Sequence, residues 1–382
     1  MIEILYLLLP LAFYSGWKAA KKNTIKQCIT SNKLADDYVK GVNYLLSEKP
    51  DKALEVFINH PDVDEYTAET YLLLGNMFRN RGEVDRALRL HQNLMARSSL
   101  NKDQKSLVMF ALGEDYLAAG MLDRAESVFQ ELQNSEPENV NACAPLRRIY
   151  EQTHEWEKAI EATHCSKRKK IPVTDQKLIS HYYCEMAEQQ MALGKLHRVE
   201  EYIAKANKNY KKSARVMVLQ ADLLQRKKND EQAFQLYLQA IQQDSRLLAH
   251  LSTKIMKIAL KIGKNEELEQ LLLQLYRKDS SVLACLLKLS LSNASANIST
   301  DFLLNDLATK NLDIDSIIKS ISILQQQERF CAEHEKLSLI QQALENYLQK
   351  KASFQCQNCG YQMQDYLWRC PACYQWDVVS HT

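Results

Sequence analysis

The stretch from residue 75 to residue 94, GNMFRNRGEVDRALRLHQNL, places small and large residues at intervals that recur elsewhere in the chain. Offsets of 0, 3, 7, 12 and 16 hold, in order, Gly75, Phe78, Gly82, Ala87 and His91. Thirty-eight residues later the same offsets hold Gly113, Tyr116, Gly120, Ala125 and Phe129. Thirty-four residues earlier, four of the five offsets hold Gly41, Tyr44, Ala53 and Phe57. The stretch is therefore one copy of a repeat.

Each copy predicts two short helices packed as a hairpin. Gly75 lets the first helix approach the second, Phe78 fills the groove one turn further on, and Gly82 marks the bend. The second helix presents Ala87 at the closest crossing and His91 one turn later. Because a single hairpin leaves one face unburied, neighbouring copies are expected to stack into a solenoid.

Further copies are predicted towards the C-terminus, with weaker patterns. The fourth to seventh copies contain, in turn, Tyr150, Trp156 and Ala159; Ala187, Gly194, Ile203 and Ala206; Ala221, Leu224, Ala233, Tyr237 and Ala240; and Met256, Gly263, Leu268 and Leu272. Segments 281–310 and 313–350 are interpreted as diverged amphipathic helix pairs. A period near 34 residues with this order of small and aromatic residues resembles the tetratricopeptide repeat family. That resemblance implies an all-α superhelix, which we place at residues 34–350.

The composition agrees with a helical protein. The chain has 382 residues, 46% of them hydrophobic, and only nine Gly and seven Pro. Its 49 basic and 47 acidic residues are interspersed, so no net field favours nucleic acid, and none is expected as a partner. Six scattered cysteines are predicted to be unpaired thiols in a reducing compartment. A basic cluster, Lys167–Lys170, is interpreted as a solvated loop, the alternative being attraction to anionic headgroups or an acidic partner.

The N-terminal end predicts a membrane anchor. Residues 4–17, ILYLLLPLAFYSGW, contain no charge, and Lys18, Lys21 and Lys22 follow at once. A cleaved signal peptide is the competing interpretation, but its positive charges would precede the apolar run. The positive-inside rule then places the rest of the chain in the cytosol. We therefore expect a transmembrane helix within residues 1–20 and a single-pass protein.

Four cysteines near the C-terminal end predict a metal site. They form two C-x2-C pairs separated by ten residues, namely Cys356, Cys359, Cys370 and Cys373. Two such pairs present four thiolates to one tetrahedral ion, and a closed site of this kind favours a structural role over catalysis. The alternative is four structural or redox cysteines without metal. Nearby aromatic residues are expected to form an apolar shell around the ion, namely Tyr361, Tyr366, Trp368, Tyr374 and Trp376.

The identity of the metal stays open on chemical grounds. Zinc and iron both accept four thiolates in tetrahedral geometry. The short paired knuckles resemble those of rubredoxin, which favours iron over zinc by resemblance alone. We assign residues 351–382 to a small rubredoxin-like metal-binding domain.

Taken in order, three segments resemble the lipopolysaccharide assembly protein B family of Gram-negative bacteria. They are the start MIEILYLLLP, the repeats DYVKGVNYLLSEKPDKALEVF and GNMFRNRGEVDRALRLHQ, and the end CQNCGYQMQDYLWRCPAC. The resemblance implies a cell inner-membrane protein facing the cytosol, whose four terminal cysteines bind iron. It also implies that the protein acts with the membrane AAA+ protease FtsH to promote degradation of the LpxC deacetylase, and serves other lipopolysaccharide assembly proteins.

Three functions remain to be weighed. The first is a non-catalytic adaptor that binds a protease and its substrate. The second is a rubredoxin-like electron carrier, which leaves the repeats unexplained. The third is a cochaperone that clamps carboxylate ends of other proteins, for which Asn76 and Arg79 on the first helix of the second copy are candidate partner-binding residues. The motifs of common hydrolases and phosphate-binding loops are missing from the sequence, so we do not expect an enzyme.

Overall fold

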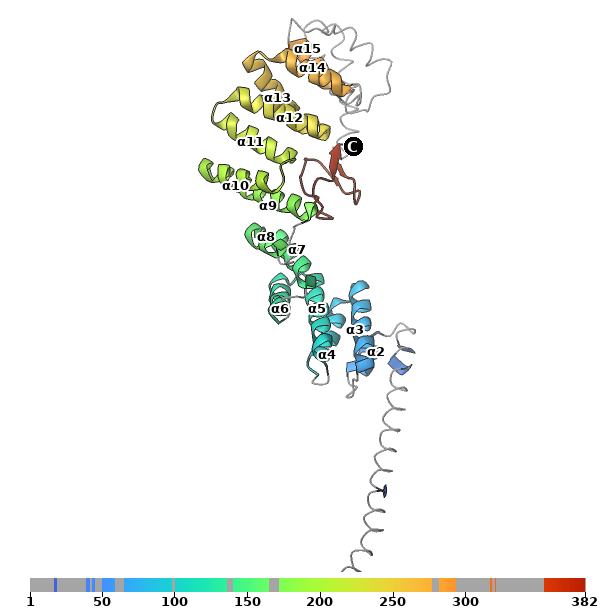
Figure 1. Ribbon diagram of the computed structural model, residues 1–382. Coiled ribbons are helices and arrows are strands. Elements are labelled where there is room, and N and C mark those ends of the chain that lie inside the picture. Colours follow the sequence, from blue (N-terminus) through green and yellow to red (C-terminus); the bar gives the residue numbers. More distant parts are fainter. Residues whose placement is uncertain are drawn as a thin grey trace, which may run out of the picture. The chain divides into compact units, whose positions relative to one another are not determined.

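The structure is a computed structural model that divides into two compact units, residues 1–168 and 169–382. It describes residues 50–58, 65–97, 100–135, 140–164, 172–276, 282–292 and 354–381, and the separate positions 17, 18, 39–41, 43, 44, 317 and 320. Each unit is a stack of helices, and the second also carries a small sheet (Figure 1).

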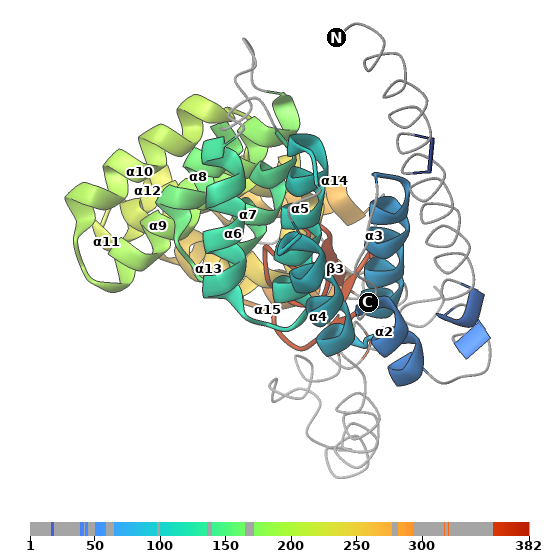
Figure 2. The ribbon, with the colours of Figure 1, turned by 90° about the horizontal axis from the view of Figure 1, so that it is seen from below.

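The described helices of the first unit run from α2 to α8. Their bounds are α2 Pro50–Ile58, α3 Glu65–Asn80, α4 Val84–Met95, α5 Lys102–Ala118, α6 Leu122–Ser135, η1 Val140–Ala142, α7 Cys143–Gln152 and α8 Trp156–His164. Helices α3 and α4, α5 and α6, and α7 and α8 form successive hairpins, and α4 and α5 connect the first two by packing together (Figure 2).

The predicted packing of the helix hairpins is confirmed in this unit. A Cβ atom added to Gly75 would lie 2.2 Å from Nε2 of His91, and one added to Gly113 would lie 2.5 Å from the Phe129 ring. The two glycines are therefore what allows the paired helices to approach so closely. Ala87 is fully buried at the crossing. Gly82 has a φ of +81°, a left-handed conformation that glycine adopts without steric cost and that ends the first helix.

The second unit continues the repeats. Its helices are α9 Val173–Ala192, α10 Leu196–Asn209, α11 Ala214–Arg226, α12 Asp230–Gln243, η2 Ser245–Leu247, α13 Leu248–Ile262, α14 Asn265–Tyr276 and α15 Leu283–Ser292. The fourth to seventh predicted copies are thus confirmed as helix hairpins, α7 with α8 through α13 with α14. Their small residues Ala187, Ala221 and Ala233 are fully buried. Of the two predicted diverged pairs, only α15 lies within a continuous described range.

The chain is not helical throughout. Three short strands, β1 Phe354–Cys356, β2 Gln362–Met363 and β3 Val379–His381, form an antiparallel sheet in the order β2-β1-β3. The all-α assignment is therefore corrected for the C-terminal domain, because a segment with two cysteine turns folds back on itself and pairs its ends as strands. We refer to residues 354–381 as the ribbon.

Three further predictions concern segments that the structure describes only in part. No helix among these residues has both the length and the apolar character needed to cross a bilayer. The predicted anchor lies outside them apart from Trp17 and Lys18, and so does the basic cluster Lys167–Lys170. The prediction of thiols without a disulfide bond is confirmed for Cys184 and Cys285 but is wrong for Cys143, which is disulfide-bonded.

Candidate metal centre and its docking surface

The four predicted cysteine ligands come together in the ribbon. All four Sγ atoms lie within 4.8 Å of one another. The sulfurs of Cys356 and Cys373 are 3.6 Å apart, and those of Cys359 and Cys370 are 3.7 Å apart. A tetrahedral ion with bonds of about 2.3 Å to sulfur requires sulfur separations of roughly 3.8 Å. The donor set therefore fits one ion held by four thiolates, and the ribbon contains a four-cysteine metal-binding site.

The same backbone turn builds both halves of the site. The amide of Gly360 donates to the carbonyl of Cys356, and the amide of Tyr374 donates to the carbonyl of Cys370, each at 2.9 Å. Gly360 and Tyr374 follow the second cysteine of their pairs and both have left-handed backbone angles, with φ of +75° and +59°. Glycine adopts this conformation freely, whereas tyrosine does so at a cost. Each pair is therefore a knuckle that directs two sulfurs to a common point.

The electrostatics of the site differ between its cysteines. A backbone hydrogen bond from Tyr361 favours the Cys359 thiolate, but desolvation and the hydrogen bonds shared with the other three sulfurs outweigh it and raise the pKa of Cys359 to about 12. A side-chain hydrogen bond from Asn358 lowers the pKa of Cys373 to about 6, so this sulfur is ionised at neutral pH. The thiolate is the form that binds metal. A bound ion with four protein sulfurs has no open coordination position, so its contribution here is to hold the two knuckles together.

The predicted aromatic shell around the metal is largely wrong. Tyr361 is 47% exposed and Tyr374 is 37% exposed. The small core of the ribbon instead contains the buried residues Met363 and Val379 beside the cysteines. Tyr366 does pack against this core, as predicted, and also against the repeats of the second unit. Trp368 and Trp376 pack against the repeats.

Asp377, just after the second knuckle, is a main attachment point of the ribbon to the repeats. Its carboxylate lies 3.0 Å from Nε2 of His181 and 2.8 Å from Nζ of Lys177, both on α9. Its carbonyl accepts a hydrogen bond from Arg246 at 3.2 Å. Burial opposes ionisation of Asp377, but His181 and Lys177 outweigh it and lower the pKa of this carboxyl. Beside it, Trp376 stacks on the His181 ring, with ring centres 4.8 Å apart and planes at 15°.

Arg215 on α11 is the second attachment point. Its side chain is only 1% exposed, and its Nη2 donates to Glu185 and Glu188 of α9 at 2.8 Å each. The guanidinium carbon lies 5.5 Å from the ring centres of both Trp368 and Trp376. A desolvated cation over an aromatic face is stabilised by about 2 kcal/mol. Arg215 therefore links two helices and two aromatic residues of the ribbon.

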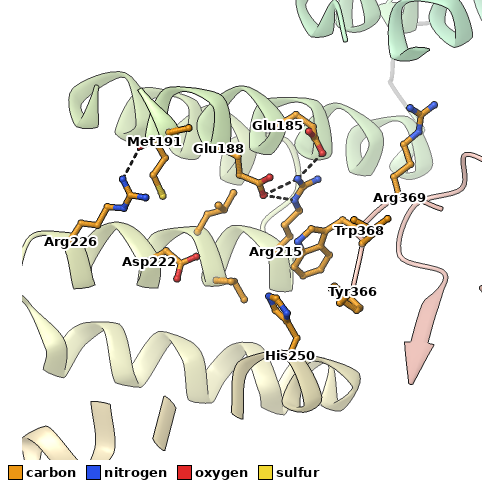
Figure 3. A pocket seen from close by; sticks show the side chains of 14 residues that line it. Glu185, Glu188, Met191, Arg215, Asp222, Arg226, His250, Tyr366, Trp368 and Arg369 are labelled. Carbon is orange, nitrogen blue, oxygen red and sulfur yellow. Dashed lines mark hydrogen bonds and ion pairs between the residues drawn. The ribbon is translucent and has the colours of Figure 1, made fainter. Parts of the chain in front are cut away.

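The ribbon and the repeats together line a chamber of about 520 Å³ that is partly open to solvent (Figure 3). Glu188 of α9, Asp222 of α11 and His250 of α13 line it from the repeat side, and Trp368 lines it from the ribbon side. In Figure 3 Arg226 lies at the end away from the ribbon, where its guanidinium donates to the carbonyl of Met191 at 2.7 Å. The ribbon contributes Tyr366, Leu367, Trp368 and Arg369 to its lining.

The two residues predicted to bind a partner lie on α3. Arg79 donates to Oδ1 of Asp115 at 2.8 Å and to the carbonyl of Ala111 at 3.2 Å. Oδ2 of the same carboxylate lies 2.5 Å from Nδ1 of the fully buried His91. Asn76 lies three residues before Arg79 and has a buried side-chain oxygen without a hydrogen-bond partner among the described residues. Arg79 therefore holds adjacent repeats together, and a role in partner binding stays a prediction.

The docking residues on the repeats were missed from the sequence, although a signal for them exists. His181, Arg215 and His250 each stand six residues before the small or apolar position that marks their repeat, Ala187, Ala221 and Met256. Three polar residues at one repeat position lie on one face of successive first helices. That regularity identifies a shared surface, but not what covers it.

Hairpins of this repeat type together with a four-thiolate ribbon define the class of the protein. It is a tetratricopeptide-repeat protein with a C-terminal metal-binding ribbon. Family comparisons agree, since residues 70–105 match the tetratricopeptide repeat and residues 354–380 match the rubredoxin metal binding domain.

Curated relatives extend over the whole chain. Lipopolysaccharide assembly protein B of Escherichia coli strain K12 is 32% identical over 389 residues, covering 100% of this chain and 98% of the relative. Its counterpart in Haemophilus influenzae is 29% identical, with the same coverage. The chain therefore belongs to the lipopolysaccharide assembly protein B family, and as a tetratricopeptide-repeat protein of that family it is not an enzyme.

Solved structures add only a distant likeness. A tetratricopeptide repeat protein from Parabacteroides merdae is 13% identical, covers 72% of this chain and 98% of its own, and aligns with a TM-score of 0.35.

Proposed function

We propose that this protein is a non-catalytic inner-membrane adaptor in lipopolysaccharide synthesis. It promotes proteolysis of the LpxC deacetylase by the membrane protease FtsH and scaffolds other lipopolysaccharide assembly proteins. The observation that carries the proposal is the match along the whole chain to relatives named lipopolysaccharide assembly protein B. The identities of the protease and its substrate come from the family resemblance.

The chemistry of the described residues supports binding over catalysis. Among the charged groups of the chamber, Arg215 pairs with Glu185 and Glu188, and Asp222 pairs with Lys254 of α13. The metal site is closed by four thiolates and has no position for a substrate. Helix hairpins that stack leave an extended surface for protein partners.

A membrane tether would give this binding its effect. We propose that residues 1–20 anchor the chain, that residues 34–350 form the solenoid, and that residues 351–382 form the metal domain, which holds iron, with zinc as the alternative. A membrane protease and a tethered adaptor meet in two dimensions, which raises their effective concentration without new contacts. A tethered solenoid can thus increase the rate at which a client reaches the protease.

The experiment that tests the proposal is a pulse-chase of LpxC in the host of this protein. Depletion should lengthen the LpxC half-life and raise lipopolysaccharide, and the wild-type chain should restore both. Depletion of FtsH should abolish the effect of the adaptor. An unchanged LpxC half-life after depletion would rule out the proposed adaptor.

The same experiment distinguishes the adaptor from the electron carrier. One observation favours that alternative, because Cys359 is exposed and an electron could reach the site. An electron carrier requires a metal that changes oxidation state, so a zinc-loaded protein would be inactive while LpxC turnover stayed normal in the depleted cells. An adaptor should work with either metal.

A further inference from the structure

The residues that attach the ribbon to the repeats flank its second knuckle on both sides. Trp368 stands two residues before Cys370, and Trp376 stands three residues after Cys373. We call the two segments that flank the knuckle, residues 368–369 and 376–377, its arms. The arms pair through a bridge between Arg369 and Trp376 and through a hydrogen bond of 2.9 Å from the Asp377 amide to the Trp368 carbonyl. The positions of the attaching side chains therefore depend on the knuckle that holds the metal.

Within the ribbon itself, little besides the metal site holds these arms in place. Its core contains two buried apolar side chains apart from cysteine, Met363 and Val379. Tyr374 and Asp377 have φ of +59° and +56°, left-handed angles that residues other than glycine adopt only when their surroundings enforce them. A segment of this size gains most of its folding free energy from its metal. Metal removal is therefore expected to release both arms.

The surface on the repeats, in contrast, is built without the ribbon. Arg215 is held by Glu185 and Glu188 from the neighbouring helix, so its position does not require the tryptophans. Its Nη1 atom has no hydrogen-bond partner among the described residues, and neither has Nδ1 of His181. Water can satisfy both atoms once the ribbon leaves. An interface with this many polar groups is typical of parts that separate without unfolding.

We propose that the ribbon is a metal-dependent latch on the repeats of the second unit. With metal bound, the second knuckle presents Trp368, Trp376 and Asp377 to the surface formed by His181, Arg215 and Lys177 and covers it. When the metal leaves, the arms lose their geometry and that surface becomes available to solvent or to a protein partner. The latch goes beyond the adaptor proposal and does not depend on the identity of any client.

Radiolytic hydroxyl-radical footprinting of the full chain tests the latch, because it measures the solvent exposure of individual side chains. The protein is compared as purified with metal, after anaerobic removal of metal by a chelator, and after reloading with zinc. The His181 ring and Trp376 should become severalfold more reactive without metal and return to the protected level with zinc. The internal reference is Tyr237 of α12, whose side chain is fully buried in the core of the repeats.

Two results would overturn the proposal. The first is protection of His181 and Trp376 that stays the same after metal removal. The second is a parallel rise at Tyr237, because the repeats would then unfold with the ribbon and no separable latch would exist.

A variant separates docking from metal binding. Arg215→Ala removes the cation between the two tryptophans, so His181 and Trp376 should become exposed while one equivalent of metal is retained. The matched control is Arg198→Ala on the exposed face of α10. Should Arg215→Ala fail to fold, Asp377→Asn weakens the same attachment from the ribbon side with a smaller change. Protected His181 in both variants would show that these contacts do not hold the latch.

Discussion

At the scale of single residues, the buried His91 ring both fills the space between two helices and forms hydrogen bonds with polar groups around it. It occupies the place that Phe57 and Phe129 occupy in the neighbouring copies, directly beneath Gly75. Its ring is fully buried, yet both nitrogens have partners, Asp115 at 2.5 Å and the carbonyl of Leu72 at 3.3 Å. A histidine is tolerated in this core because the next repeat supplies the carboxylate.

We therefore expect Asp115→Ala to destabilise the first unit strongly. The substitution leaves His91 buried without the partner of Nδ1 and removes the ion pair of Arg79, and breaking a buried pair in this way costs about 3–5 kcal/mol. Thermal unfolding followed by circular dichroism measures the effect. The control is Glu131→Ala, an exposed carboxylate on α6, which should leave the midpoint nearly unchanged. Equal midpoints for the two variants would contradict the structural role of Asp115.

His181 predicts a pH dependence of the docked ribbon. Burial lowers its pKa from the ordinary value near 6.5, Asp377 opposes that shift, and Arg215 and Lys177 add to it. Because the docked state binds fewer protons than the released state, the contribution of His181 is fully present above about pH 6.5 and is lost as the pH falls towards the lowered pKa. Each unit of depression corresponds to about 1.4 kcal/mol.

The measurement compares wild type with His181→Gln between pH 7.5 and 5.5, with ribbon exposure measured by footprinting of Trp376 and bound metal assayed at each pH. Wild-type docking should weaken more steeply than docking of the variant. The same slope in both proteins would show that His181 does not carry the pH dependence.

At the scale of helices and strands, the sequence was sufficient wherever local spacing decides the structure. Gly75 with Ala87, and each C-x2-C pair, act within one hairpin or one turn, so the helix pairs and the two knuckles could be predicted. The docking of the ribbon could not, because Asp377 meets His181 across 196 residues of sequence and Arg246 across 131. The aromatic residues of the ribbon were accordingly assigned to the nearest core, the metal site.

Ala87→Glu tests the packing of the α3–α4 hairpin. Ala87 is fully buried where the helices cross, so glutamate would add volume and an unpaired charge, each costing several kcal/mol. The thermal midpoint should fall, and local unfolding should spread to adjacent repeats. Ala118→Glu, at an exposed position near the end of α5, is the matched control. An unchanged midpoint for Ala87→Glu would show that this crossing contributes little.

Cys359→Ser tests the ribbon as an independent element. Removing one of four thiolates should abolish tight metal binding, leaving less than one equivalent after anaerobic purification, and should unfold the ribbon. The helical signal of the repeats should persist, because α9 to α14 keep their own core. The scattered Cys285→Ser is the control and should retain full metal content. Elemental analysis decides, and full metal in the Cys359→Ser protein would contradict the four-thiolate site.

At the scale of the whole molecule, the proposed function separates into parts with different physical roles. The repeats supply binding surface, the ribbon covers one such surface in the second unit, and the predicted anchor supplies concentration. Loss of a binding surface lowers the affinity for the partner, and a modest increase in protein concentration does not restore binding. Loss of a tether lowers only the local concentration, which more protein can replace.

Deleting residues 2–17 should therefore produce a defect that depends on dosage. At native expression the truncated chain should leave the membrane fraction and lengthen the LpxC half-life, because encounters with a membrane protease then occur in three dimensions. Overproduction should restore turnover, since the effective concentration supplied by a flexible tether is of millimolar order and can be approached from solution. An unrelated single-pass helix in place of residues 1–20 should restore turnover at native expression. Failure of both overproduction and helix replacement would show that the N-terminal segment makes specific contacts and is more than a tether.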